Sequence, residues 1–175
     1  LALTQSRLKM LVAYSTVAQV GYLFLLFPLA TLVPPGVADS AVQGGVMQAL
    51  AHGLAKAAMF AAAGSMIVAT GRDDIARLGG VGARLPLTLF SFGLAGVTLM
   101  GLPPSGGFSA KWLLLSAALE TGQWWWVVVM IVGGLLTAAY VFKVLRRAFL
   151  PMAQGDRVAR VPRTLEFSAF ALALA

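Results

Sequence analysis

Long runs of apolar residues, each close to the length that crosses a bilayer, alternate along the chain with short polar breaks. A transmembrane helix needs about 20 residues that are mostly apolar. The pattern predicts four membrane spans and the start of a fifth, at about 8–33, 41–70, 85–120, 124–145 and from about 164. The last run is too short to cross a membrane, so we expect 1–175 to be a single transmembrane domain, a fragment of a longer protein.

The third run is too long for one straight span. Its residues would make a helix of about 50 Å, whereas the hydrocarbon core is about 30 Å thick. Pro103 and Pro104, followed by Gly106 and Gly107, interrupt it. Tandem prolines remove backbone donors, and glycines allow the chain to turn. We therefore predict an all-α, polytopic transmembrane helix bundle with one discontinuous helix, although a short hairpin loop or a packing kink would fit the same residues.

Composition agrees with a membrane environment. The chain is 59% hydrophobic and 11% charged, which leaves too little polar surface for a water-soluble domain. It has no cysteine, and His52 is its one histidine. Disulfides, thiolate metal sites and iron–sulfur ligation are thus excluded, and we expect neither a metal site nor a cofactor on this chain.

The formal net charge of +7 could suggest nucleic acid, but the positions of the charges indicate a membrane. The loops 34–40 and 120–123 hold no lysine or arginine; their charged residues are Asp39 and Glu120. The positive-inside rule then places the basic loops in the cytoplasm and residues 124–126, all tryptophan, at the outer interface. We expect the cytoplasmic membrane of a bacterium. Eleven basic residues lie on the cytoplasmic side of this topology: Arg7, Lys9, Arg72, Arg77, Arg84, Lys143, Arg146, Arg147, Arg157, Arg160 and Arg163.

The remaining lysines, Lys56 and Lys111, fall inside predicted spans. A lysine at the centre of a transmembrane helix costs about 2.5–3.5 kcal/mol, and such residues usually mark ion pathways. Lysine also changes its protonation state readily when it is taken out of water. Both lysines are therefore candidate proton carriers. The alternative is a static lysine bonded to backbone carbonyls or to a carboxylate.

Other polar residues could extend such a path. Gln48 and His52 precede Lys56 at intervals of four, so the three share one helix face. His52 could relay a proton, or it could be a packing residue. The first span also carries polar side chains that could line a hydrated path or bond neighbouring helices. They are Tyr14, Ser15, Thr16, Gln19 and Tyr22.

Three segments resemble one family of membrane proteins. They are KMLVAYSTVAQVGY (9–22), HGLAKAAMF (52–60) followed by Gly64 and Ser65, and GLPPSGGFSAKW (101–112). Their order and spacing are similar to those of the antiporter-like subunits of respiratory complex I, membrane-bound hydrogenases and Mrp-type cation/proton antiporters.

The resemblance implies an inverted-repeat transporter fold of about fourteen helices in which each five-helix repeat has a broken helix, a lysine and a half-channel for protons. This chain would be most of the second repeat. Lys56 would be the central lysine, Lys111 the lysine of the outward half of the broken helix, His52 the relay histidine and Lys9 a basic residue at the start of its helix. Gln48 departs from the family, which often has a second histidine at that position.

We therefore expect a proton-translocating, antiporter-like subunit of a redox-driven pump. It would have no catalytic site of its own but could belong to an NADH:quinone oxidoreductase-type translocase. Its partners would be other membrane subunits, the lipid bilayer and protons, with no nucleic acid. One alternative is an Mrp-type subunit that exchanges Na⁺ for protons, and another is a non-conducting scaffold subunit.

Overall fold

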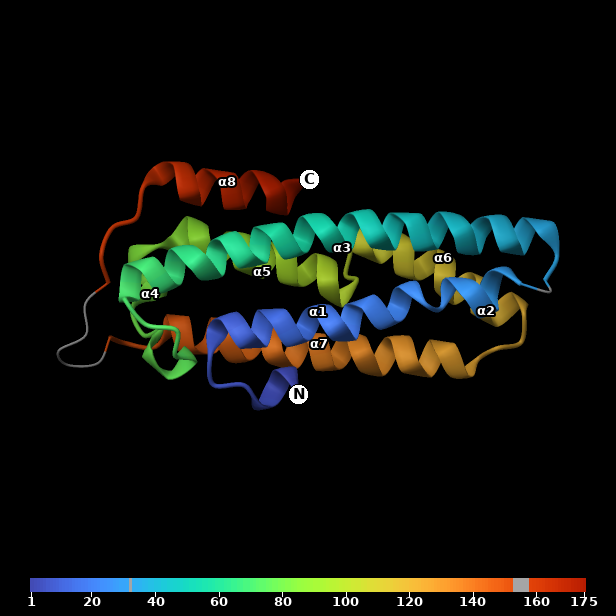
Figure 1. Cartoon of the computed structure of the whole chain (residues 1–175), viewed down its shortest axis with the longest axis horizontal. Coiled ribbons are helices and arrows are strands. Elements are labelled where there is room, and N and C mark those ends of the chain that lie inside the picture. Colours follow the sequence, from blue (N-terminus) through green and yellow to red (C-terminus); the bar gives the residue numbers. More distant parts are fainter. Residues whose placement is uncertain (32, 153–157) are drawn as a thin grey trace.

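The computed structural model describes residues 1–31, 33–152 and 158–175. Their regular secondary structure is helical, apart from an isolated bridge between Arg7 and Asp74. The long helices run side by side along the long axis, with α8 on one outer side (Figure 1). The elements are η1 (Ala2–Thr4), α1 (Leu8–Leu23), α2 (Leu26–Ala30), α3 (Pro35–Thr70), η2 (Ile75–Arg77), α4 (Val81–Arg84), α5 (Pro86–Met100), α6 (Gly106–Glu120), α7 (Trp125–Phe149) and α8 (Arg163–Leu174).

The predicted all-α transmembrane bundle is confirmed. Three segments are long and apolar enough to cross a membrane: Leu8–Ala30, Pro35–Thr70 and Trp125–Phe149. Helix ends differ from the predicted ones. Helix α3 begins at Pro35 rather than near residue 41, because proline fits the first turn of a helix, where its missing N–H is not needed. Helix α7 continues to Phe149, so Arg146 and Arg147 belong to the helix and not to a loop.

The interruption expected in the third apolar run lies between α5 and α6, which have 15 residues each. At about 1.5 Å per residue, neither reaches across a core of about 30 Å. Helix α5 ends at Met100 and is followed by Gly101, whose φ of 79° lies in the left-handed region that glycine adopts without strain. Ser105 then starts α6 by accepting a hydrogen bond from the amide of Phe108. That the two helices form one membrane crossing stays a prediction.

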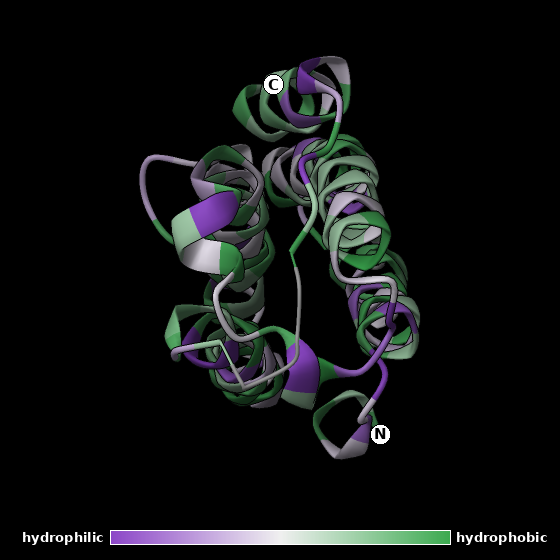
Figure 2. Ribbon diagram, turned by 90° about the vertical axis from the view of Figure 1, so that its left-hand side faces the viewer, coloured by the Kyte–Doolittle hydropathy of each residue, from purple (hydrophilic) through white to green (hydrophobic). Residues whose placement is uncertain are grey.

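The helices are apolar on their outer faces as well as in the core. Viewed from one end, hydrophobic residues predominate along the helices, and hydrophilic ones gather in the connections (Figure 2). Large side chains such as Leu135 and Phe142 are exposed on α7. A helix that is hydrophobic on all sides belongs in a membrane or a large core. The chain is therefore part of an integral membrane protein.

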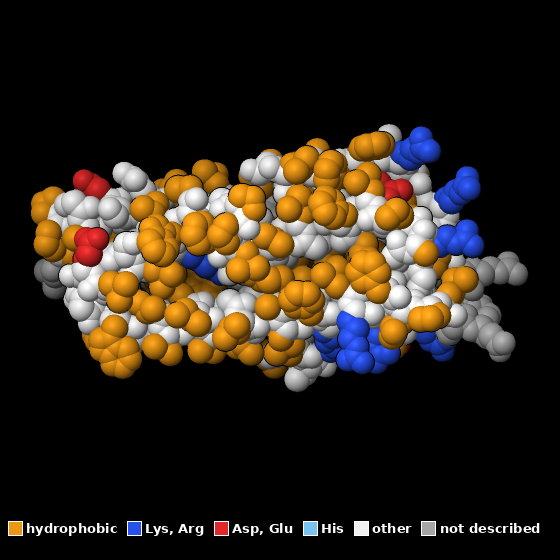
Figure 3. All heavy atoms as spheres, turned by 180° about the vertical axis from the view of Figure 1, so that it is seen from behind, with side chains coloured by type: hydrophobic (Ala, Val, Ile, Leu, Met, Phe, Trp, Pro, Cys, Tyr) orange, Lys and Arg blue, Asp and Glu red, His pale blue; other side chains and the backbone are white. Residues whose placement is uncertain are grey.

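Most basic side chains gather at one end of the molecule, while hydrophobic ones cover its middle (Figure 3). This is the end where α1 starts, α3 ends and α7 ends (Figure 1). Arg157 lies outside the described residues. That this end faces the cytoplasm stays a prediction.

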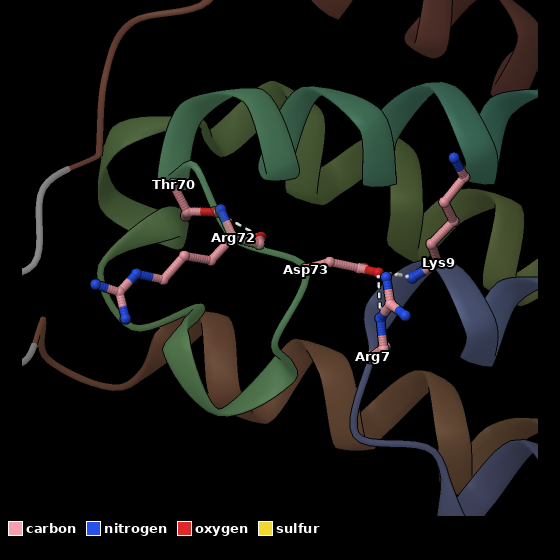
Figure 4. Close-up of polar contacts among 5 residues, drawn as sticks. All are labelled: Arg7, Lys9, Thr70, Arg72 and Asp73. Atoms are coloured by element: carbon pink, nitrogen blue, oxygen red, sulfur yellow. Dashed lines mark hydrogen bonds and ion pairs between the residues drawn. The ribbon is translucent and has the colours of Figure 1, made fainter.

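Asp73 joins the start of α1 to the loop that follows α3 (Figure 4). Its carboxylate pairs with Nε of Arg7 at 3.1 Å and accepts the amide of Lys9 at 2.8 Å, and its backbone carbonyl accepts the amide of Leu8 at 3.0 Å. The first amides of a helix have no partner within the helix. Asp73 therefore caps α1 from another segment of the chain.

We expect Asp73→Ala to lower the free energy of unfolding by about 1 kcal/mol, the usual effect of losing a helix cap. Arg7→Gln should change it by less than about 0.5 kcal/mol, because an exposed ion pair contributes little. Thermal unfolding of the full-length protein in detergent would measure both. Equal losses in the two variants would mean that the ion pair, and not the cap, matters.

Candidate functional site

Lys56 lies in the middle of α3 and points toward α1. Its side chain is 6% exposed, and Nζ donates hydrogen bonds to the carbonyl of Val12, at 3.2 Å, and to the hydroxyl of Ser15. Ser15 in turn donates to the same carbonyl at 2.8 Å. Small residues such as Ala55 and Ala58 allow α3 to approach its neighbours closely. The amine is thus held by neutral oxygens of α1.

Lys111 lies on α6 and reaches back to the end of α5. Its Nζ donates to the carbonyls of Leu99, at 2.7 Å, and Met100, at 3.0 Å. The last carbonyls of a helix have no partner within the helix and carry partial negative charge. The ring of Tyr22 lies 4.9 Å from Nζ, within cation–π range. A side chain at Gly101 would collide with the stem of Lys111, so glycine both ends α5 and lets this lysine cap it.

Gln19 lies on α1 one turn beyond Ser15, the partner of Lys56, and bonds groups around Lys111. Its amide nitrogen donates to the carbonyl of Leu99 at 3.0 Å and to the hydroxyl of Thr137 at 3.2 Å. Gln48 donates to the amide oxygen of Gln19 at 3.4 Å. Lys111 and Gln19 therefore share the Leu99 carbonyl. One network of buried polar groups joins α1, α3, α5, α6 and α7.

Three buried polar atoms have no hydrogen-bond partner among the described residues. They are Oε1 of Gln48, Nδ1 of His52 and the hydroxyl of Tyr140. His52 is 9% exposed and sits one turn of α3 before Lys56. Buried polar groups are nearly always bonded to protein or to ordered water, so these atoms mark points where a further partner would bind.

The other residues singled out from the sequence lie apart from this network. Lys9 is exposed at the basic end, with its side chain directed away from Asp73 (Figure 4). Tyr14 is half-buried on α1. Pro103, Pro104 and Gly106 are exposed in the turn before α6 and at its start. Gly107 is buried, and a Cβ there would overlap the carbonyl oxygen of Thr98.

Sequence reasoning missed Thr137 and Tyr140, which α7 brings to the network. They are the polar residues of α7 between its tryptophans and Lys143, and they stand three residues apart in an otherwise apolar segment. That isolation was a usable signal. Gln19 was noted as polar, but its place between the two lysines depends on the packing of α1 against α5 and α7.

A family model described as NADH:quinone oxidoreductase/Mrp antiporter, TM, matches residues 1–137. NADH-quinone oxidoreductase subunit N of Desulforudis audaxviator is 37% identical over 162 residues, which are 90% of this chain and 31% of that protein. The chain thus spans about a third of the length of this curated relative.

Solved structures give the same picture. A chain of the Mrp complex from Dietzia sp. DQ12-45-1b matches with a TM-score of 0.86 at 25% identity, over 99% of this chain and 39% of that one. A chain of respiratory complex I from Thermus thermophilus with bound aureothin matches with a TM-score of 0.69 at 27% identity, over 99% and 38%.

Proposed function

Because the chain belongs to the NADH:quinone oxidoreductase/Mrp antiporter transmembrane family, we propose that it forms part of a subunit that moves protons across the membrane. Lys56 and Lys111 would be the groups that take up and release the proton. The observation that carries this proposal is that α1 brings both buried lysines to one polar stripe. Lys56 bonds Ser15, and Gln19, one turn further along α1, shares the Leu99 carbonyl with Lys111.

The surroundings of the lysines suit a mobile proton. Among the residues that the structure describes, no fully buried side chain is an aspartate or glutamate, so neither ammonium group has a carboxylate to fix its charge. Buried charges without such a partner are costly and are commonly functional in membranes. Lys56 is bonded instead to a carbonyl and a hydroxyl, which remain satisfied within α1 if the amine turns away.

His52 and Gln48 would add a branch to this path. The unpartnered atoms of both side chains lie on the face of α3 that carries Lys56. Buried water could bond to both, because a buried water molecule typically has about three polar partners. A proton would then pass from the His52 side to Lys56 and leave through Lys111. Lys9 would contribute charge at the basic end.

In this proposal the complete protein works with other membrane subunits of a redox-driven complex in the cytoplasmic membrane of a bacterium. The relatives named above belong to NADH-quinone oxidoreductase, complex I and an Mrp complex. The end with Arg7, Arg72 and Arg147 faces the cytoplasm, following the positive-inside rule. Electron transfer would belong to partner subunits.

Exchange of Na⁺ for protons is the second candidate, because the Mrp complex gives a TM-score of 0.86. Hard cations prefer oxygen ligands, usually including carboxylates. The lack of a buried carboxylate among the described residues favours protons over Na⁺. Proton uptake measured with and without Na⁺ separates the two, because only an exchanger should depend on Na⁺.

The deciding experiment is proton uptake by proteoliposomes that contain the full-length protein with its native partner subunits. Wild type is compared with Lys56→Met and Lys111→Met. Lys143→Met is the matched control: this half-buried lysine of α7 bonds the carbonyls of Leu3 and Gln5, outside the network. A scaffold subunit would tolerate all three changes, whereas a conducting subunit would tolerate the change at Lys143 alone.

A further inference from the structure

Helices α1 and α7 run antiparallel (Figure 1), and each turns a stripe of small or polar residues toward the other. The stripe on α1 is Ser15, Gln19 and Tyr22, and the stripe on α7 is Gly133, Thr137 and Tyr140. Both follow the same i, i+4, i+7 spacing, which places three residues on one helix face. We call these six residues the α1–α7 seam.

The two stripes meet pair by pair. In the middle, Gln19 donates to the hydroxyl of Thr137 at 3.2 Å. At one end the hydroxyl of Tyr22 occupies the space that a side chain at Gly133 would need. At the other end the hydroxyl of Tyr140 lies close to Ser15, as well as to Gln19 and Thr137. The antiparallel register thus lines up six residues in three contacts.

A lysine lies at each end of the seam. Lys56 bonds Ser15 at the Tyr140 end. Lys111 lies over the ring of Tyr22, 4.9 Å from its centroid, at the Gly133 end. Between these ends Gln19 cannot pass a proton on, because an amide donates through nitrogen and accepts through oxygen without exchanging the two roles. A hydroxyl can accept one proton while it gives up another.

We propose that the hydroxyls of Tyr140 and Thr137 carry the proton between Lys56 and Lys111 along the α1–α7 seam. This inference rests on the proposed function and adds the connection between its two lysines. Ser15 receives the proton from Lys56 and releases its own to Tyr140. Tyr140 passes one to Thr137, which lies one turn of α7 from Gly133 and the hydroxyl of Tyr22. Buried water would complete the step from there to Lys111, so each hydroxyl ends with the proton count with which it began.

Two further observations support a role for Tyr140 in proton transfer. Its side chain is 3% exposed, yet its hydroxyl has no partner among the described residues. A buried tyrosine hydroxyl usually finds a partner, so this one is free to bond Ser15 and Thr137 in turn. A groove of about 710 Å³ between α1 and α7 is lined by Gln19, Thr137 and Tyr140. In this arrangement Gln19 is a positioning residue that orients Thr137.

The test uses the full-length protein with its partner subunits in proteoliposomes. Tyr140→Phe removes only the hydroxyl and should lower proton uptake by about tenfold or more. Thr137→Val should do the same, whereas Thr137→Ser keeps the hydroxyl and should stay within about twofold of wild type. Ser91→Ala is the control, because it removes an equally buried hydroxyl on α5 that bonds only its own helix.

The outcomes separate this inference from the proposed function. If Lys56→Met stops uptake while Tyr140→Phe and Thr137→Val pump at the wild-type rate, proton transfer along the α1–α7 seam is refuted. The proposal that the two lysines carry the proton is then retained. If both lysine variants pump normally, both proposals fall. If Tyr140→Phe assembles poorly, the comparison of Thr137→Val with Thr137→Ser tests the inference. If Thr137 had a purely structural role, serine, the smaller residue, would be at least as harmful as valine.

Discussion

Lys56→Met is expected to reduce proton uptake by at least about 100-fold, the lower range for removing a group that transfers a proton in the rate-limiting step. Methionine is similar in length and apolar, so it fills the space between α3 and α1 without a titratable amine. Because a lysine at this depth costs about 2.5–3.5 kcal/mol, assembly of the complex should be unchanged or improved. Uptake per assembled complex is the quantity to measure.

Lys111→Met should stop uptake as well, but with a different effect on stability. Lys111 bonds the carbonyls at the end of α5, and its loss leaves the carbonyl of Met100 without this donor. An unsatisfied buried acceptor costs about 1–3 kcal/mol, and because this bond is part-buried we expect a loss near the lower end of that range. We therefore expect lower thermal stability for Lys111→Met than for Lys56→Met. Equal stability of the two variants would contradict the capping role of Lys111.

Gly107→Val is expected to have the largest effect on folding. A Cβ at Gly107 would overlap the carbonyl oxygen of Thr98. Because this is a backbone atom, α5 or α6 would have to shift to make room. Overpacking of this kind usually costs about 1–3 kcal/mol, and more where backbone must shift. The amount of protein in the membrane should fall sharply, together with the unfolding temperature in detergent.

Gly106→Ala is the matched control for that variant. The nearest atom to a Cβ at Gly106 is the Cβ of Ala51 at 3.6 Å, an ordinary van der Waals contact. Alanine also favours a helix over glycine by about 1 kcal/mol. Gly106→Ala should therefore be as stable as wild type or more stable. Similar losses in both variants would show that the turn, and not the contact with Thr98, is what these glycines serve.

Much of the fold follows from features that are local in the sequence. The apolar runs predicted the transmembrane segments because a bilayer requires about 20 apolar residues in each span. Pro103 and Pro104 marked the interruption between α5 and α6 because proline cannot continue a helix. Lys56 and Lys111 stood out because a charge in an apolar run is costly. Each inference needed only neighbouring residues along the chain.

The connections between these residues could not be predicted in the same way. That Lys56 bonds Val12 and Ser15, and that Lys111 caps α5, depends on which helices pack together and at what height. Spacing on α3 suggested His52 as the partner of Lys56, but it could not show the nearer hydroxyl on α1. Tyr140 and Thr137 became candidates only when the register of α1 against α7 was known.

The shared carbonyl of Leu99 affects how easily Lys111 can move. A carbonyl oxygen has two lone pairs, and here Gln19 uses one and Lys111 the other. If the lysine swings away, both carbonyls lose its bond, but the amide of Gln19 still donates to the carbonyl of Leu99, and only the carbonyl of Met100 is left without a side-chain donor. The end of α5 would then stay folded through each swing, so the lysine could change partners many times without the helix beneath it fraying.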